Sequence, residues 1–277
     1  MPVPSVSRRA LLAVAAAAPI AAALPRTAAA GPASRLIDPM WTASGRGGDP
    51  DAGPWAEVLA RRLRLDEDGV ARFDYAGLRG ELSALNAWLD AYAAADPRTL
   101  TRPAQYAYWA NLYNALTVKL VAEAWPVDTI KTVNGGLFNT GPWKDDVASV
   151  AGQDLSLDDI EHGIMRPVFQ DPRIHYAVNC ASIGCPNLQP RPFSAAALEE
   201  MLEAGARAYV NDPRGARLDG DRLTVSSIYD WFQEDFGGTE AGVLDHLRRY
   251  AEPPLRSALE GRTGYDRDDY DWAVNAV

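Results

Sequence analysis

The chain has 277 residues, of which 47% are hydrophobic and 23% are charged, and its formal net charge is -10. An acidic balance repels phosphate backbones, and the sequence has no cluster of Lys and Arg interleaved with aromatic residues, so we expect no binding to nucleic acid. The length is sufficient for a substantial core that needs no disulfide.

The first thirty residues predict a twin-arginine export signal. Arg8 and Arg9 precede an alanine-rich apolar run from Ala10 to Leu24, and small residues follow at positions 28–30. The run is shorter than the roughly 20 apolar residues that span a bilayer. We therefore expect the signal, residues 1–30, to be removed, with no stable membrane span afterwards and a periplasmic or extracellular location.

Composition divides the remainder into two parts. Residues 31–54 are rich in Gly, Pro and Asp, which indicates an irregular or partly mobile arm. In residues 55–277 the Pro and Gly residues occur singly or in pairs between periodic segments, as turn markers do, and this pattern favours a single globular domain.

Periodicity predicts mostly helices in the first half of this domain. We expect a helix over residues 55–63, a hairpin in LDEDGVARFDY and a helix over residues 75–95. Residues 103–125 are apolar nearly all round, which is typical of a central buried helix. Asn111 and Asn114 share one face of it, where they either tie the helix to neighbouring backbone or orient a catalytic group.

The second half mixes helices with short strands. Ser156 and Asp159 form a capping pattern that begins a helix containing Glu161 and His162, which we expect to end at Pro167. Residues 173–179 suit a buried strand and residues 180–192 a loop; a helix over 194–210, a hairpin at 219–220, two helices and a last strand within 265–275 follow. The predicted class is α+β, mainly helical, with a small mixed or antiparallel sheet.

Four segments, in this order, resemble a bacterial and plant family catalogued as domain of unknown function 547: YWANLYNALTVKLV, LSLDDIEHGIMRP, DPRIHYAVNCASIGCPNL and YDWAVN. The resemblance spans about residues 75–275. His175 to Cys180 follow the family pattern H-F-A-L-x-C, with Tyr176 in place of Phe, and Ile160 to Arg166 follow I-E-H-x-I-L-R. The resemblance implies no particular activity, but the first cysteine is the more regular family feature, which argues against a disulfide as the general purpose.

The leading hypothesis is a thiol-dependent hydrolase or acyl-transferase. Cys180 would be the nucleophile and His175 or His162 its base. Glu161, Asn111 or Asn114 would hold the imidazole, and either asparagine is also a candidate oxyanion donor. On a straight strand, positions 175 and 180 point to opposite faces, so this site requires the chain to turn at Asn179.

Two other readings of the cysteines remain open. A Cys180–Cys185 disulfide in a non-catalytic exported binding or structural protein follows from the compartment and the even cysteine count. A metal site of His175, Cys180 and Cys185, completed by Glu161 or His162, is the third reading, although its spacing matches no common zinc pattern. We expect no cofactor.

Other residues carry weaker signals. Arg166 and Arg173 are candidates for binding a substrate carboxylate, or else for ion pairs with Asp158, Asp159 or Asp171. The substrate itself, a small molecule or a peptide, cannot be named from the sequence. His246 is expected to be solvated, and five tryptophans are expected in the core or in cleft walls, namely Trp109, Trp125, Trp143, Trp231 and Trp272.

Overall fold

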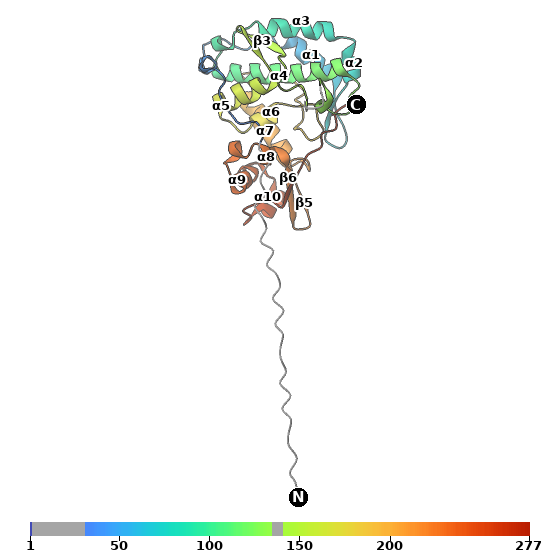
Figure 1. Cartoon of the computed structure of the whole chain (residues 1–277), viewed down its shortest axis with the longest axis vertical. Coiled ribbons are helices and arrows are strands. Elements are labelled where there is room, and N and C mark those ends of the chain that lie inside the picture. Colours follow the sequence, from blue (N-terminus) through green and yellow to red (C-terminus); the bar gives the residue numbers. More distant parts are fainter. Residues whose placement is uncertain (2–30, 135–140) are drawn as a thin grey trace.

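The computed structural model describes Met1, residues 31–134 and residues 141–277, so the predicted export signal lies outside the described residues except for Met1. Short strands lie between groups of helices along the chain (Figure 1). The α-helices are α1 (Gly53–Arg62), α2 (Tyr75–Arg79), α3 (Leu82–Ala93), α4 (Arg102–Ala124), α5 (Arg166–Phe169), α6 (Ile174–Ala177), α7 (Leu198–Val210), α8 (Ser227–Trp231), α9 (Glu240–Tyr250) and α10 (Pro253–Leu259). The strands are β1 (Leu63–Leu65), β2 (Ala71–Phe73), β3 (Ala148–Val150), β4 (Gln153–Leu155), β5 (Ala216–Asp219), β6 (Arg222–Ser226) and β7 (Arg267–Asp269). Short 3-10 turns η1 (Pro39–Thr42), η2 (Pro97–Thr99), η3 (Ile130–Thr132) and η5 (Gln233–Phe236) and a π-helical segment, η4 (Asp159–Met165), complete the list.

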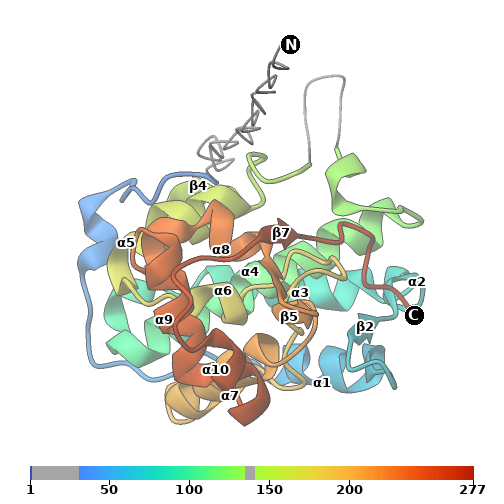
Figure 2. The same cartoon turned by 90° about the horizontal axis from the view of Figure 1, so that it is seen from below.

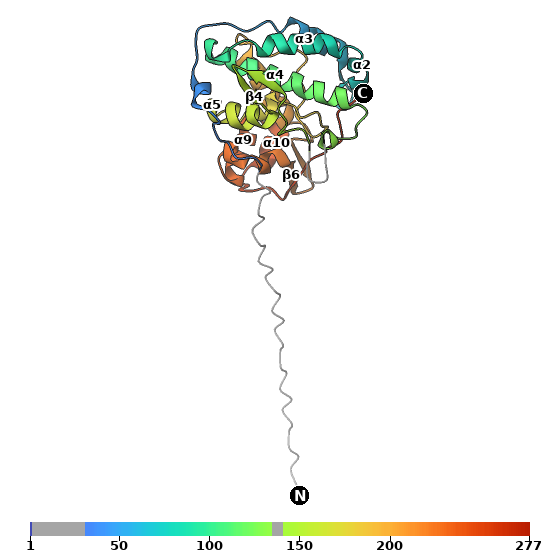
Figure 3. The same ribbon diagram turned by 45° about the horizontal axis from the view of Figure 1, so that its top comes forward.

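Helix α4 is the central buried helix that its apolar sequence predicts. Pro103 lies in its first turn, where a missing backbone N–H costs nothing. Every residue from Ala104 to Ala122 except Lys119 is buried, and α3 and η4 both pack against the helix. In Figures 1 and 3 it crosses the molecule beneath α3, at the opposite end from α9 and α10.

Two hydrophobic clusters form the core, and α7 joins them. Leu198 and Met201 at the start of α7 belong to the cluster around α4, whereas Tyr209 and Val210 at its end belong to the cluster around α9, α10 and β6. The same helix therefore packs against both halves, which suits its strongly amphipathic sequence. Within the described ranges, no helix is both long and apolar enough to cross a membrane.

The sheets are small, and the largest is mixed. β5 and β6 form the predicted hairpin, and β7 pairs with β6 in parallel. β1 pairs with β2 as the Asp-Gly turn predicts. β3 and β4 form a further hairpin that the sequence analysis did not predict. These sheets and the many helices confirm the α+β class.

The C-terminal segment after β7 runs across the molecule to β2, as Figure 2 shows. Asn275 accepts a hydrogen bond from the backbone N–H of Phe73 (2.8 Å), and its own N–H donates to the carbonyl of Ala181 (3.1 Å). The predicted last strand is therefore regular only at Arg267–Asp269, and the YDWAVN motif beyond it joins β2 to the cysteine loop.

Three predicted elements were wrong. The helix over 75–95 is broken at Gly80, where the N–H groups of Gly80 and Glu81 both turn back to Leu78 and end α2. The helix through Glu161 continues past Pro167 to Phe169, because Pro167 lies in the first turn of α5 just after the π-helical segment. Residues 174–177 form the helical turn α6 and not a strand, since Asp171 caps the turn by accepting the N–H of Arg173 (2.9 Å).

The irregular arm ahead of α1 is held along η4 by backbone hydrogen bonds. The N–H of Arg35 donates to the carbonyl of His162 (3.0 Å), and that of Ile37 to the carbonyl of Gly163 (3.1 Å). A Cβ at position 163 would lie 2.5 Å from Ile37 Cγ2, so only glycine permits this approach. Gly31 donates to the carbonyl of Trp231 (2.9 Å), which places the start of the arm beside α8.

Candidate functional site

A cavity of about 500 Å³, here called the thiol pocket, lies where η4, α6, α8 and the C-terminal segment meet. Glu161, His175, Cys180 and Cys185 all line it, so four of the residues singled out by the sequence face one space. His162, Arg166, Arg173, Asn111 and Asn114 do not line it.

The cysteine loop turns at Ala181, two residues beyond the turn at Asn179 that the hypothesis required. Asn114 on α4 forms hydrogen bonds with the backbone on both sides of Val178. Its Oδ1 accepts the N–H of Asn179 (2.8 Å), and its Nδ2 donates to the carbonyl of Ala177 (2.9 Å). Asn179 then accepts the N–H of Ala181 (2.8 Å) and donates to the carbonyl of Pro186 (2.8 Å). Ala181 has a φ of 61°, so the chain turns sharply just after Cys180.

The outer side of the loop is tied down by the C-terminal segment. Ile183 donates to the carbonyl of Ala273 and Gly184 to that of Asp271, both at 2.8 Å. A Cβ on Gly184 would meet the backbone of Asp271 at 2.9 Å, so a larger residue would push the two segments apart. The loop is therefore held between α4 on one side and the YDWAVN motif on the other.

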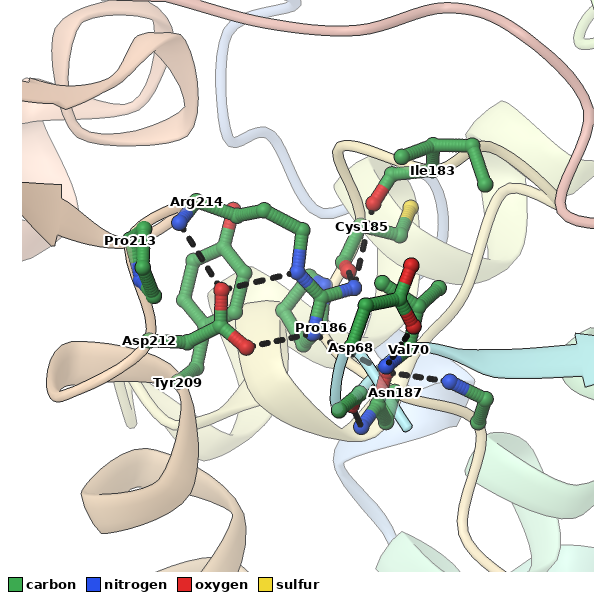
Figure 4. A network of polar contacts seen from close by, with 12 residues as sticks. Asp68, Val70, Ile183, Cys185, Pro186, Asn187, Tyr209, Asp212, Pro213 and Arg214 are labelled. Carbon is green, nitrogen blue, oxygen red and sulfur yellow. Dashed lines mark hydrogen bonds and ion pairs between the residues drawn. The ribbon is translucent and has the colours of Figure 1, made fainter. Parts of the chain in front are cut away.

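Arg214 fixes the far end of the loop (Figure 4). Its guanidinium donates to the carbonyls of Ile183 (3.1 Å) and Cys185 (3.2 Å) and is paired with Asp212 (2.8 Å). It also donates to Asn187 Oδ1 (3.1 Å), which accepts the N–H of Ala71 (2.9 Å). These contacts join the loop to β2 and to the end of α7.

The two cysteines are free thiols in contact with each other. Their Sγ atoms are 2.8 Å apart, and Cys185 Sγ also accepts the backbone N–H of Cys180 (3.1 Å). The Tyr270 hydroxyl lies 3.1 Å from each sulfur, and the Ser182 hydroxyl lies 3.2 Å from Cys180 Sγ. Cys180 is half-buried and Cys185 is buried.

This environment makes the two thiols unequal. Burial raises the pKa of Cys185, but hydrogen bonds from Cys180, Tyr270, Ser182 and the Cys180 N–H outweigh burial and lower that pKa to about 6. The hydrogen bond to Cys185, together with burial, raises the pKa of Cys180 well above its usual value. The hydrogen bonds that point to Cys185 therefore favour the first negative charge of the pair on this sulfur, with Cys180 as the protonated partner.

His175 lies in the same pocket but is held by carboxylates. Its Nε2 is 2.7 Å from Asp235 Oδ2 and its Nδ1 is 3.6 Å from Glu161 Oε1, and the ring stacks on Phe232 with centroids 4.4 Å apart. Burial opposes the charged form, but the hydrogen bonds and charges of Asp235 and Glu161 prevail and raise the pKa of His175. His175 thus lies between two carboxylates that favour its protonated form, whereas the hydrogen bonds of the Cys180 thiol go to Cys185, Ser182 and Tyr270.

Glu161 is the buried anion of this group. Burial raises its pKa, but His162, His175 and Tyr113 together lower it to about 2, so the carboxylate is ionised. His162 accompanies it: its Nδ1 is 3.2 Å from Arg166 Nη1, and burial lowers its pKa. His162 is therefore neutral at pH 7 and faces Arg166 instead of a thiol.

Both arginines form ion pairs, but only Arg173 forms one of those predicted as the alternative to substrate binding. Arg173 pairs with Asp171 (2.7 Å), as one of the predicted pairings has it, and also with Glu199 and Glu203. Arg166 pairs with Asp235 (2.6 Å) and Glu234 (2.5 Å) on η5, which lies too far along the chain for local sequence to indicate. A direct contact with substrate stays a prediction for both.

Further polar residues line or touch the pocket without having been singled out as site residues, among them Asp158, Lys131, Lys144, Ser182 and Tyr270. Burial, with a smaller effect from the Glu161 charge, raises the pKa of Asp158 to about 6. Its position three residues before Glu161 on a predicted helix was the signal that would have found it, since residues three apart share a helix face. Ser182 lies two residues after Cys180 in the cysteine loop, whereas Lys131, Lys144 and Tyr270 reach the pocket through tertiary contacts.

Three of the tryptophans expected in the core or in cleft walls, Trp143, Trp231 and Trp272, line the pocket, while Trp109 is buried in the core beside Trp41. Each of the three is only partly buried, so part of each ring faces the cavity.

The two buried asparagines act as the structural amides of the sequence analysis. Asn111 pairs with the backbone of Phe193 through its amide nitrogen and its amide oxygen, at 2.9 and 2.8 Å.

Replacing Asn114 by alanine should lower the free energy of unfolding by about 2 to 4 kcal/mol, because two buried backbone groups lose their partners. Chemical denaturation measures this loss, and Lys119→Ala on the same helix, which removes only an i,i+4 ion pair, should cost below about 1 kcal/mol. An equal loss in both variants would contradict the role assigned to Asn114.

His246 is not solvated, contrary to the sequence-based expectation. Its Nε2 is 2.7 Å from the Tyr176 hydroxyl, and burial lowers its pKa to about 4.

Between pH 6.5 and 4 the unfolded chain therefore binds a proton at His246 that the folded chain does not, so stability falls as the pH drops through this window. We expect about 1 to 3 kcal/mol of this acid-induced loss to disappear in His246→Gln. Denaturant midpoints from pH 4 to 7 measure it, and parallel curves for both proteins would refute the assignment.

No group of three or more His, Cys, Asp or Glu side chains within residues 31–134 and 141–277 is arranged to hold a metal ion. The third reading of the cysteines therefore has no geometric support in the part of the chain that the structure describes.

Comparison with known proteins agrees with the motifs. No curated protein and no solved structure matches the chain. Residues 97–210 match a family described as "Protein of unknown function, DUF547". The matched region includes α4, η4, α6 and the cysteine loop, but not the YDWAVN motif. The chain is therefore a DUF547 domain-containing protein.

Proposed function

We propose that the protein is an exported thiol-dependent hydrolase or acyl-transferase, with Cys180 as the nucleophile and Cys185 as its base. The observation that carries the proposal is the pair of unequal thiols on the wall of the thiol pocket. Cys180 is the more exposed of the two and still has its proton, and the Cys185 thiolate is 2.8 Å away in position to accept it. Cys185 thus takes the role that the sequence suggested for a histidine.

The proposed first step is acyl transfer to sulfur. Cys180 Sγ bonds to the carbonyl carbon of an ester or amide while its proton passes to Cys185. The bond to the leaving oxygen or nitrogen then breaks as that atom takes up this proton from Cys185, which becomes a thiolate again. The Ser182 and Tyr270 hydroxyls, 3.2 and 3.1 Å from Cys180 Sγ, are candidate donors to the developing oxyanion.

The second step returns the enzyme to its starting state. Water, or an acceptor in a transferase, attacks the thioester carbon and breaks the bond to Cys180. Asp158, whose pKa of about 6 is near neutral, is the candidate base for this attack. The buried His175 cation between Glu161 and Asp235 stabilises the pocket wall and is not required to release its proton.

A second candidate rests on the same sulfur distance. Shortening 2.8 Å to the roughly 2.05 Å of a disulfide bond requires a movement of less than about 1 Å. In an oxidising compartment the protein would then be a non-catalytic exported binding or structural protein with a Cys180–Cys185 disulfide.

Thiol chemistry separates the two candidates. We expect two titratable thiols in the exported protein isolated without reductant, turnover of 4-nitrophenyl acyl esters, and its loss in Cys180→Ser but not in Ser83→Ala, an exposed residue of α3. An intact mass about two protons lower, in a bond that resists reduction, would exclude the hydrolase and support the second candidate. The same mass, measured on the exported protein, tests removal of residues 1–30.

A further inference from the structure

The cations that line the thiol pocket are unusual for this chain. Of its 27 Lys and Arg residues only Lys119, Lys131 and Lys144 are lysines, and the last two line the pocket. Lys119 lies on α4 and pairs with Glu123 (3.2 Å). Elsewhere the chain builds its ion pairs with arginine, so two lysines at one cavity point to a role other than holding the fold together.

Lys131 has no carboxylate partner within 4.0 Å among residues 31–134 and 141–277. Its Nζ lies 3.6 Å from the centroid of the Trp272 ring, so a cation–π contact holds it. Burial lowers the pKa of Lys131, and the nearby Cys180 offsets this only in part. An ammonium group that is partly desolvated and lacks an anion gains free energy when an anionic ligand supplies one.

The backbone fixes Lys131 relative to the thiols. Lys131 belongs to η3, which Thr129 caps through its hydroxyl, and the carbonyl of Asp128 accepts the N–H of Val274 (2.9 Å). The same C-terminal segment carries Trp272 and holds the cysteine loop through Gly184. The ammonium group, the indole ring and the sulfur pair are therefore positioned by one connected stretch of backbone.

The tryptophans form an apolar wall beside this cation. Trp231 stacks against Trp272 with centroids 5.4 Å apart and an interplanar angle of 27°, and Trp143 meets Trp272 edge-on at 6.0 Å. Such rings offer flat faces on which a planar or apolar group packs.

The negative groups of the pocket leave Lys131 without a carboxylate partner. Glu161 is paired with His175, and Asp158 feels the opposite charge of Lys144. Neither lysine forms an ion pair within 4.0 Å among the described residues, and the pKa of Lys131 is affected by Cys180 but by no carboxylate.

We propose that Lys131, with the wall formed by Trp143, Trp231 and Trp272, is a subsite for a carboxylate attached to an aromatic group. As a statement about substrate this rests on the proposed function: the acyl compound attacked by Cys180 would present its carboxylate to Lys131 and its planar part to the indoles. The binding of an aromatic carboxylate at this subsite does not depend on catalysis by Cys180.

Two ligands that share one ring system test the proposed subsite. 2-Naphthoate and 2-naphthylmethanol differ in charge but share the ring system, and titration calorimetry with the whole protein at pH 7.5 measures both affinities. We expect the naphthoate to bind roughly tenfold more tightly. Lys131→Met should remove that preference and leave the binding of the alcohol unchanged, whereas Lys119→Met should keep it. Equal affinities in the wild type, or a preference that survives in Lys131→Met, would overturn the subsite.

Repeating the titration with Cys180→Ser and assaying ester turnover in parallel keeps the two proposals apart. A naphthoate preference in a protein that turns over no ester supports the subsite and rejects the hydrolase. Turnover of neutral esters without any preference for the naphthoate rejects the subsite and leaves the hydrolase in place.

Discussion

Replacing Arg166 by methionine should lower the free energy of unfolding by about 3 to 5 kcal/mol, the largest loss of stability that we expect from a single substitution in this chain. The Arg166 side chain is 1% exposed, and its guanidinium pairs with Asp235 and Glu234 and donates to the carbonyl of Pro32. Removing the charge takes away one of the two cationic partners of Asp235, which is largely buried and whose pKa is lowered by His175 and Arg166 against the effect of burial. Methionine fills the space but supplies none of these hydrogen bonds.

Urea denaturation measures the loss, with Arg191→Met as the matched control. Arg191 also forms an ion pair, with Glu200 at 2.9 Å, but 54% of its side chain is exposed. Its removal should cost less than about 1 kcal/mol. If the two variants lose the same stability, the buried cluster does not hold the fold in the way its geometry implies.

This cluster explains why residues far apart in the sequence form one site. His162 comes from η4, Arg166 from α5, His175 from α6 and Asp235 from η5. The arm reaches the cluster through Pro32. Since each charged group is satisfied by another element, the wall of the pocket forms only when the elements pack together. The motif residues Glu161, His162 and Arg166 therefore support the pocket wall that Cys180 also lines.

The sequence predicted those parts of the fold that local rules decide. Helix α4 followed from an apolar surface on all sides, the hairpins from Asp-Gly turns, and the start of η4 from Ser156 and Asp159, which exchange the expected hydrogen bonds at 3.0 and 3.1 Å. Helix α6 was mistaken for a strand because four apolar and aromatic residues fit either structure, and the cap by Asp171 decided between them. Pro167 was misread because a π-helical segment precedes it.

Only some of the residues predicted for the site line the thiol pocket, and the sequence did not indicate their partners. Local sequence indicated that Cys180, His175 and Glu161 share a cleft, and all three line the thiol pocket. It gave no means of finding Asp235, which occupies one nitrogen of His175, or Tyr270, which contacts both sulfurs. These partners come from 60 and 90 residues away from the groups they contact, so only packing reveals which hydrogen bonds the imidazole and the thiols make.

The assignment of the negative charge to Cys185 leads to a second large effect. In Cys185→Ala, Cys180 loses both the neighbour that accepts its proton and the main cause of its raised pKa, while burial still raises that pKa and Ser182 and Tyr270 lower it. We therefore expect this single thiol to titrate near the ordinary value of about 8.5. At pH 7 most wild-type molecules should carry a thiolate in the sulfur pair, whereas only a few per cent of the Cys185→Ala molecules should carry a Cys180 thiolate. We expect alkylation by iodoacetamide to slow by roughly 30-fold or more, and ester turnover to fall with it.

The pH dependence separates a lost base from a damaged fold. In the wild type the alkylation rate should rise with pH through about 6, where the pair gives up its first proton, and level off above pH 7. In Cys185→Ala the rise should move above pH 8, and the rate at pH 10 should recover to within a few-fold of the wild type, because the Cys180 nucleophile itself is intact. Tyr270→Phe removes one hydroxyl but leaves Cys180 as a donor to Cys185. The pH at which its alkylation rate rises should therefore shift less than in Cys185→Ala. A wild-type rate at pH 7 in Cys185→Ala would show that the charge does not depend on Cys185, and a rate that stays low at pH 10 would show that the substitution closes the pocket.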